Sequence, residues 1–139
     1  MNRQSTRLSK TVQLTTLVLA LLALGATQVL AQSAWEAPAD ADGYQNTVKA
    51  DAKSIAEGKK VYETYCKLCH GDSGKGDGPS GGSLPIKPAN FADKDIMKQS
   101  DGSLAWKILT GKGAMPSWAP VLQEPQIWSV INYIRTFSK

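Results

Sequence analysis

The sequence predicts an all-α domain in which three to four helices are joined by long loops. Apolar residues recur at helical spacing in three stretches after residue 50, and no segment alternates as a strand would. Six of the 12 glycines fall between Gly71 and Gly82, followed by Pro85 and Pro88, which is typical of a long irregular loop. A chain of 139 residues allows one ordinary domain and excludes a large multidomain enzyme.

The first 31 residues have the pattern of a secretory signal peptide. Arg3, Arg7 and Lys10 form a positive start, residues 17–24 form an apolar segment, and small residues end at Ala31, where we expect cleavage. The alternative is an uncleaved membrane anchor, because the apolar segment approaches the length of a membrane span. No cysteine lies near the cleavage point, which argues against a lipoprotein anchor. We therefore expect a periplasmic protein that contacts a membrane only if this segment is retained.

The positive charge of the chain belongs mostly to that segment. It holds three of the 16 basic residues and none of the 12 acidic ones, so its removal lowers the formal charge from +4 to about +1. A nearly neutral mature chain has no electrostatic footprint for nucleic acid. Residues 32–50 show no apolar period and are rich in Ala, Asp and turn formers, so we expect an arm that leads into a domain at residues 51–139.

The first helix is expected from about Ser54 into the cysteine pair. Ser54 and Glu57 match a capping box, and the residues that recur at helical spacing are Ile55, Gly58, Tyr62, Tyr65, Cys66 and Cys69. A short helix is expected at residues 92–98. Another is expected at 102–110, capped by Ser100 or Asp101 and stopped by Gly111.

The last helix is expected to begin near Pro125, because proline is favoured in the first turn of a helix. It carries Ile127, Ile131 and Ile134 at helical spacing, with Trp128 and Phe137 alongside. About half of the remaining chain would then lie in loops, which leaves few side chains for a core. A buried cofactor would complete that core.

Residues 66–70 read Cys-Lys-Leu-Cys-His, the C-x-x-C-H pattern of covalent c-type haem attachment. Two cysteines one helical turn apart can each form a thioether with one vinyl group of the same haem. His70 is then the expected proximal ligand of the haem iron. The alternatives are a thioredoxin-like redox pair, a disulfide or half of a zinc site. A redox pair lacks its βαβ setting, and a closed zinc site needs four ligands where the chain has three Cys and His residues.

The second axial ligand is expected to be a methionine, since the chain has no second histidine. Met97 lies in a predicted helix beside Ile96, where a methionine usually fills a gap in the core. Met115 lies in a glycine-rich loop before Pro116, which keeps it extended and able to project onto a haem face. We therefore favour Met115, although it could instead anchor the loop in the core.

These residues resemble the monohaem class I cytochromes c, similar to the small bacterial periplasmic kind, over about residues 54–137. The likeness rests on Cys66-x-x-Cys69-His70, Gly58 and Tyr62, the loop at 111–118 and the last helix. It implies the class I cytochrome c fold, wrapped around one covalently bound haem c with its iron. It also implies that Gly58 lets the first helix approach residues 128–133 of the last.

The resemblance further implies a backbone carbonyl that accepts the Nδ1 proton of His70, usually from a proline in the following loop. Pro79, Pro85 and Pro88 are the candidates, and the sequence does not choose among them. The possible walls of the haem pocket are Leu84, Pro85, Phe91, Trp106 and Trp118, each of which is also a plausible core residue.

Two protein ligands saturate the iron, which favours electron transfer over catalysis. We expect an electron carrier, or an electron-transfer subunit of a respiratory or dehydrogenase system. Its redox partners would be a donor dehydrogenase or reductase complex and an acceptor oxidase or reductase, with Lys67 and Lys112 available to steer an acidic partner. The alternatives are a haem-based catalyst or ligand sensor in which Met115 is labile, and a thiol redox protein.

Overall fold

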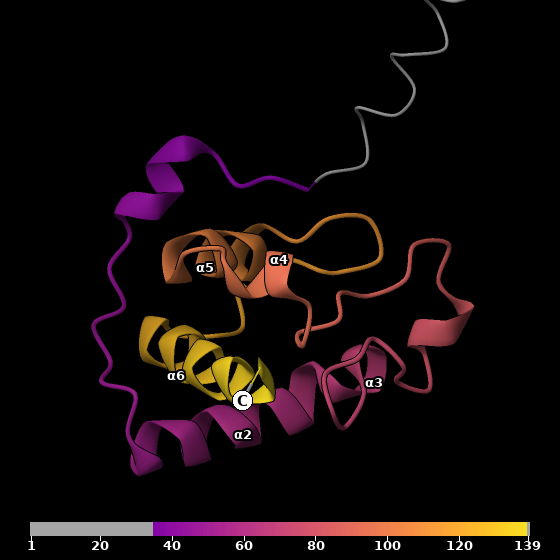
Figure 1. The fold of residues 1–139 in the computed structure, drawn as a ribbon, viewed down its shortest axis with the longest axis horizontal. Helices are drawn as coiled ribbons and strands as arrows, with labels where there is room; N and C mark the ends of the chain where they lie inside the picture. Colours follow the sequence, from indigo (N-terminus) through magenta and orange to yellow (C-terminus); the bar gives the residue numbers. More distant parts are fainter. Residues whose placement is uncertain (1–34, 139) are drawn as a thin grey trace, which may run out of the picture. The chain divides into compact units, whose positions relative to one another are not determined.

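Two helices, α2 (Ala52–Tyr65) and α6 (Glu124–Ile134), pack against each other along their lengths (Figure 1). Gly58 on α2 makes this approach possible. A Cβ atom at that position would lie 1.9 Å from the carbonyl oxygen of Ser129 on α6. The expectation that Gly58 meets residues 128–133 of the last helix is therefore confirmed.

The computed structural model describes residues 35–138. The segment from Ala37 onward forms one compact unit. The signal peptide expected at residues 1–31 lies outside the described residues. Among residues 35–138, no helix combines the length and the apolar character needed to cross a membrane.

The described chain is helical, which confirms the all-α class. It contains five α-helical segments rather than three to four, because the predicted first helix breaks at Cys66 and the cysteine pair continues as the single turn α3 (Lys67–His70). The short helix predicted at 92–98 is the single turn α4 (Lys94–Met97). The longer α5 (Asp101–Thr110) begins one residue before the predicted start, with Ser100 as its N-cap and Gly111 after its end. Three short 3-10 helices complete the set: η2 (Ala39–Gly43), η3 (Gly81–Ser83) and η4 (Arg135–Ser138). Between residues 35 and 138 the only β-type pairing is an isolated bridge between Lys112 and Met115.

The start of α2 differs from the prediction. The N-cap is Asp51, whose side chain accepts a hydrogen bond from the Ser54 amide at 2.9 Å, while Ser54 Oγ accepts from the Asp51 amide at 3.2 Å. Ser54 is thus the third residue of the helix instead of its cap. The capping box predicted between Ser54 and Glu57 is wrong, because the same spacing fits one turn earlier.

The core lies where α2, α5 and α6 meet. Tyr62, Ile127, Val130 and Ile131 are its most deeply buried large side chains, at 0–2% exposure. The full cluster of buried residues consists of Val61, Tyr62, Phe91, Leu104, Ala105, Ile108, Leu122, Ile127, Trp128, Val130, Ile131 and Ile134. Cys66, Ala89, Met97, Met115 and Trp118 are partly buried against this cluster. The predicted functional residues therefore border the core.

Candidate functional site

The two cysteines lie where α2 gives way to α3. Cys66 ends α2 and precedes α3, and the amides of Cys69 and His70 both donate to its carbonyl, at 3.1 and 2.9 Å. Both thiols are free and half-buried. Burial, with a smaller contribution from Cys69, raises the pKa of the Cys66 thiol to about 12. A thiol redox pair needs the opposite, a lowered pKa on its attacking cysteine, so this environment does not favour that alternative.

His70 is held by a backbone carbonyl. Its Nδ1 lies 3.3 Å from the carbonyl oxygen of Ala89. Because a carbonyl can only accept, this bond requires the proton on Nδ1 and leaves the lone pair of Nε2 available to a metal. Burial lowers the pKa of His70, and the bond to Ala89 acts in the opposite direction. The carbonyl belongs to the residue after Pro88, so none of Pro79, Pro85 and Pro88 provides it.

The glycine-rich loop packs directly on the backbone of the motif. The amides of Gly76, Gly78 and Ser80 donate to the carbonyls of His70, Cys69 and Leu68 at 2.9, 3.2 and 3.0 Å. Any Cβ at position 78 would lie 2.4 Å from the Leu68 oxygen. The loop therefore satisfies the carbonyls that end α3, and glycine is required because backbone lies against backbone.

Phe91 is the predicted pocket residue that lies beside His70. The two rings stack with centroids 4.6 Å apart and an angle of 16° between their planes. Tyr62 and Phe137 lie next to Phe91, at centroid distances of 6.3 and 6.2 Å, and Tyr62 Oη donates to the Gly71 carbonyl at 2.8 Å. The sequence pattern predicts Tyr62 and Phe137 on helices and indicates no role for them at the site. Their helical spacing could identify them as core residues, but not as neighbours of Phe91.

Met115 lies in the loop that follows α5. Lys112 and Met115 exchange two backbone hydrogen bonds, of 2.9 and 3.1 Å, which close the loop into a tight turn. The side chain of Met115 is half-buried against the core.

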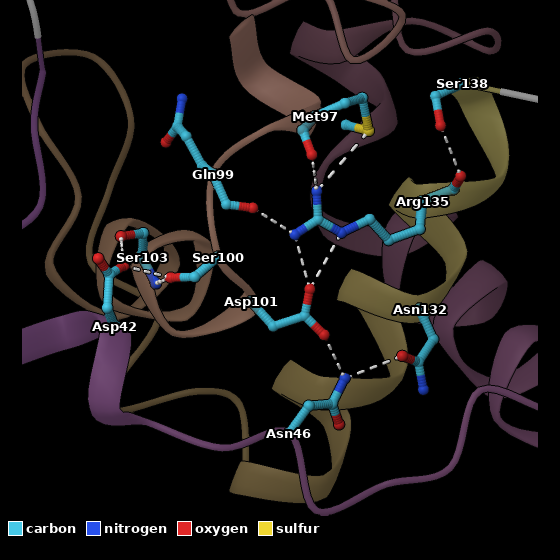
Figure 2. Close-up of polar contacts among 10 residues, drawn as sticks. All are labelled: Asp42, Asn46, Met97, Gln99, Ser100, Asp101, Ser103, Asn132, Arg135 and Ser138. Carbon is cyan, nitrogen blue, oxygen red and sulfur yellow. Dashed lines mark hydrogen bonds and ion pairs between the residues drawn. The ribbon is translucent and has the colours of Figure 1, made fainter. Parts of the chain in front are cut away.

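Met97, the other candidate, is at the end of α4, where Arg135 Nη1 lies 2.8 Å from its carbonyl and 3.9 Å from its sulfur (Figure 2). Its sulfur thus already has a partner.

The other predicted pocket residues have different surroundings. The indole of Trp118 packs against Tyr65, with ring centroids 5.2 Å apart. Trp106 is half-buried on α5. Leu84 is half-buried and Pro85 exposed in the loop after η3. Their contacts with a haem stay a prediction.

Comparison with known proteins gives one family. Residues 53–134 match the family described as cytochrome c oxidase, cbb3-type, subunit III. Among similar proteins, a cbb3-type cytochrome c oxidase subunit CcoP from Azospirillum sp. (strain B510) is 33% identical over 94 residues. That alignment covers 64% of this chain and only 30% of the relative. A cytochrome c6 from Cladophora glomerata is 36% identical over 90 residues, covering 60% of this chain and 89% of the relative.

One solved structure has a fold similar to that of this chain. It is a reducing HAO-like protein complex of Kuenenia stuttgartiensis, matched with a TM-score of 0.61 and 28% identity. The match covers 69% of this chain and 50% of that chain. The chain therefore corresponds to a part of these larger proteins and to nearly the whole of the small relative.

Proposed function

The chain belongs to the family of cbb3-type cytochrome c oxidase subunit III domains and is a monohaem class I c-type cytochrome with a covalent haem c, and from this premise we propose that it transfers single electrons. In this proposal Cys66 and Cys69 bind the haem as thioethers, and His70 and Met115 are its axial ligands. When bound, the haem supplies an iron that alternates between the ferrous and ferric states.

The observation that carries the proposal is the state of His70. Its Nδ1 bonds to Ala89 at 3.3 Å, so Nε2 is the nitrogen left to bind iron. The two free thiols lie in the same helical turn as this ring. Free thiols, a neutral imidazole and a chain that orients its ring form the donor set that a c-type haem requires.

Met115 is the better candidate for the second ligand. The sulfur of Met97 faces the Arg135 guanidinium, and the Met97 carbonyl accepts from the same group. Moving Met97 toward a haem would break these contacts, whereas the side chain of Met115 has no such partner among the described residues. A thioether ligand also raises the reduction potential relative to stronger donors.

The experiment uses the expressed, matured protein and two methionine variants. Haem staining after denaturing electrophoresis should be positive, because thioether bonds survive denaturation. The ferric protein should show the long-wavelength iron–thioether absorption band. Met115→Ala should abolish the band, and Met97→Leu, which keeps volume and apolar character, should retain it. If the band is instead lost in Met97→Leu and survives in Met115→Ala, Met97 is the axial ligand and Met115 is not.

Ligand binding separates electron transfer from catalysis or sensing. With both axial positions held by the protein, the ferrous form should not bind carbon monoxide, while Met115→Ala should bind it. Binding of carbon monoxide by the unmodified protein would instead support the haem-based catalyst or sensor.

We further propose that residues 1–31 direct export and are removed, leaving a periplasmic protein that begins at Gln32. Mass spectrometry of the protein from its native host gives the mature N-terminus directly.

Because one relative is named as an oxidase subunit, we propose that the partners are redox proteins, a reductase or dehydrogenase as donor and an oxidase or reductase as acceptor. Purification from native membranes and periplasm, followed by reduction kinetics with the proteins recovered, tests this.

A further inference from the structure

The N-terminal arm, residues 37–50, docks on the first turn of α5. Ala41, in η2 of the arm, is 1% exposed. Gly102 of α5 lies against it so closely that a Cβ at position 102 would be 2.0 Å from the Ala41 carbonyl oxygen. Because the contact at position 102 is with backbone, no side-chain movement could relieve the clash that a larger residue would cause.

Polar contacts fix the same junction. Oδ1 of Asp42 accepts hydrogen bonds from the hydroxyls of Ser100 and Ser103, the latter at 2.8 Å (Figure 2). These two bonds lower the pKa of Asp42, because both hydroxyls donate to its charged form. A negative group at the start of a helix also complements the helix dipole.

Asn46 attaches the arm a second time. Its Nδ2 donates to Asp101 Oδ2 at 2.8 Å and to Asn132 Oδ1 at 2.9 Å, and so connects the arm to both α5 and α6 (Figure 2). The arm thus contacts α5 through backbone packing, through the Asp42 carboxylate and through Asn46.

The opposite end of α5 is bound to the Met115 loop. The Trp118 amide donates to the Ile108 carbonyl at 3.1 Å, and Ser117 Oγ donates to the Leu109 carbonyl. Gly111, with φ +65°, turns the chain so tightly that a Cβ there would lie 2.5 Å from the Met115 carbonyl oxygen. The loop is therefore fastened to the last turn of α5, and a shift of α5 carries Met115 with it.

We propose that the arm, residues 37–50, positions Met115 by fixing the first turn of the helix that carries the Met115 loop. This proposal rests on the assignment of Met115 as an iron ligand. Asp42, Asn46 and Gly102 are positioning residues in it, because they act on Met115 only through α5.

The test compares two glycine-to-alanine variants of the full, haem-loaded protein. Gly102→Ala introduces the clash with Ala41 while raising the helix propensity of α5, so any loss comes from displacement of the arm. Gly43→Ala is the matched control, because a Cβ at position 43 meets nothing within 4 Å. For each protein, the iron–thioether band and far-ultraviolet circular dichroism are followed during heating.

In Gly102→Ala we expect the midpoint for loss of the band and the midpoint of unfolding both to fall. The midpoint for the band should fall about 5 °C further, the scale expected for loss of one or two hydrogen bonds in a domain of this size. Gly43→Ala should behave as the unmodified protein. A purely structural arm would lower both midpoints equally in Gly102→Ala, and that result would overturn the proposal.

A second pair of variants keeps the test decisive if Gly102→Ala does not fold. Asp42→Ala removes the acceptor of Ser100 and Ser103, and Asp40→Ala alters an exposed carboxylate of the same 3-10 helix. Early loss of the band in Asp42→Ala but not in Asp40→Ala supports the proposal, and equal behaviour contradicts it. An unmodified protein without the band would instead disprove the Met115 assignment itself, which distinguishes the two failures.

Discussion

Arg135 donates to Oδ1 of Asp101 from both Nε and Nη2, at 3.0 and 2.7 Å. The same guanidinium donates to the carbonyls of Met97 and Gln99 at 2.8 and 2.6 Å. The side chains of Arg135 and Asp101 are only 25% and 30% exposed, so water competes weakly for these bonds. One side chain from the end of the fold thereby connects the end of α4 to the start of α5 (Figure 2).

Replacing Arg135 with alanine should lower the free energy of unfolding by about 2 kcal/mol, because several charge-assisted bonds are lost and two backbone carbonyls lose their partner. Arg135→Lys should recover only part of this, since an ammonium group cannot reproduce the planar fork. Urea denaturation measures both. Lys98→Ala is the control, as its ion pair with Asp95 is exposed and should contribute less than about 1 kcal/mol. Equal effects at positions 135 and 98 would contradict the prediction.

Gly58→Ala should destabilise the protein by about 3 kcal/mol, because the added Cβ would lie 1.9 Å from the Ser129 carbonyl and the two helices would have to separate. Gly82→Ala, where a Cβ meets nothing within 4 Å, should change the free energy of unfolding by about 0.5 kcal/mol or less. The midpoint of chemical denaturation is the measurement. A Gly58→Ala protein of unchanged stability would mean that α2 and α6 do not approach so closely.

Asp51 should make the stability of the protein depend on pH in the acid range. The hydrogen bond from the Ser54 amide lowers the pKa of Asp51 in the folded state. Its stabilisation is therefore complete above the unfolded pKa of about 3.9 and is lost as the pH falls through the lower, folded value. Asp51→Asn keeps a capping oxygen but does not titrate. Thermal unfolding should show a difference between the two proteins at pH 6 that disappears toward pH 2, and a constant difference would exclude this role.

Lys112 should contribute to steering of anionic redox partners. It is exposed in the loop of Met115, and its ammonium group forms no ion pair within the described chain, whereas Lys67 pairs with Asp72 at 2.6 Å. Lys112→Ala should slow oxidation of the ferrous protein by hexacyanoferrate(III) about two- to threefold at low ionic strength, and less as salt is added. The double variant Lys67→Ala/Asp72→Ala preserves net charge and should have little effect. A rate for Lys112→Ala that equals the unmodified rate at all salt concentrations would remove this contribution.

The sequence predicted both ends of α5 and the start of α6 to within a residue, because Gly111 and Pro125 mark these positions. The last helix was expected to continue to near the C-terminus, but α6 ends at Ile134 and a 3-10 helix follows it. The start of α2 was predicted one turn late. Two capping patterns overlap there, and tertiary contacts decide between them. Ser54 is 6% exposed, and its hydroxyl donates to the nearby Lys49 carbonyl at 2.7 Å. It also accepts from Asn132 of α6 at 3.2 Å, a contact that no local pattern contains.

The candidate site shows the same division between local and distant information. The C-x-x-C-H pattern and the loop around Met115 are local, so the sequence alone could propose both, and their role as haem ligands stays a prediction. The carbonyl that holds His70 belongs to Ala89, and which loop residue reaches the ring depends on how the intervening glycines pack. Docking of the arm on Gly102 and of Arg135 on Asp101 joins residues far apart in the chain, and period and composition carry no information about either pair.

The packing of α2 on α6 also has a consequence for the order of events during synthesis. Gly58 of α2 lies against α6, the last α-helix of the described chain, so this part of the α2 surface has no native partner until that helix has been made. Such long-range contacts form late, because the whole intervening loop must close first. The contact between α2 and α6 is therefore among the last native contacts that the chain can complete.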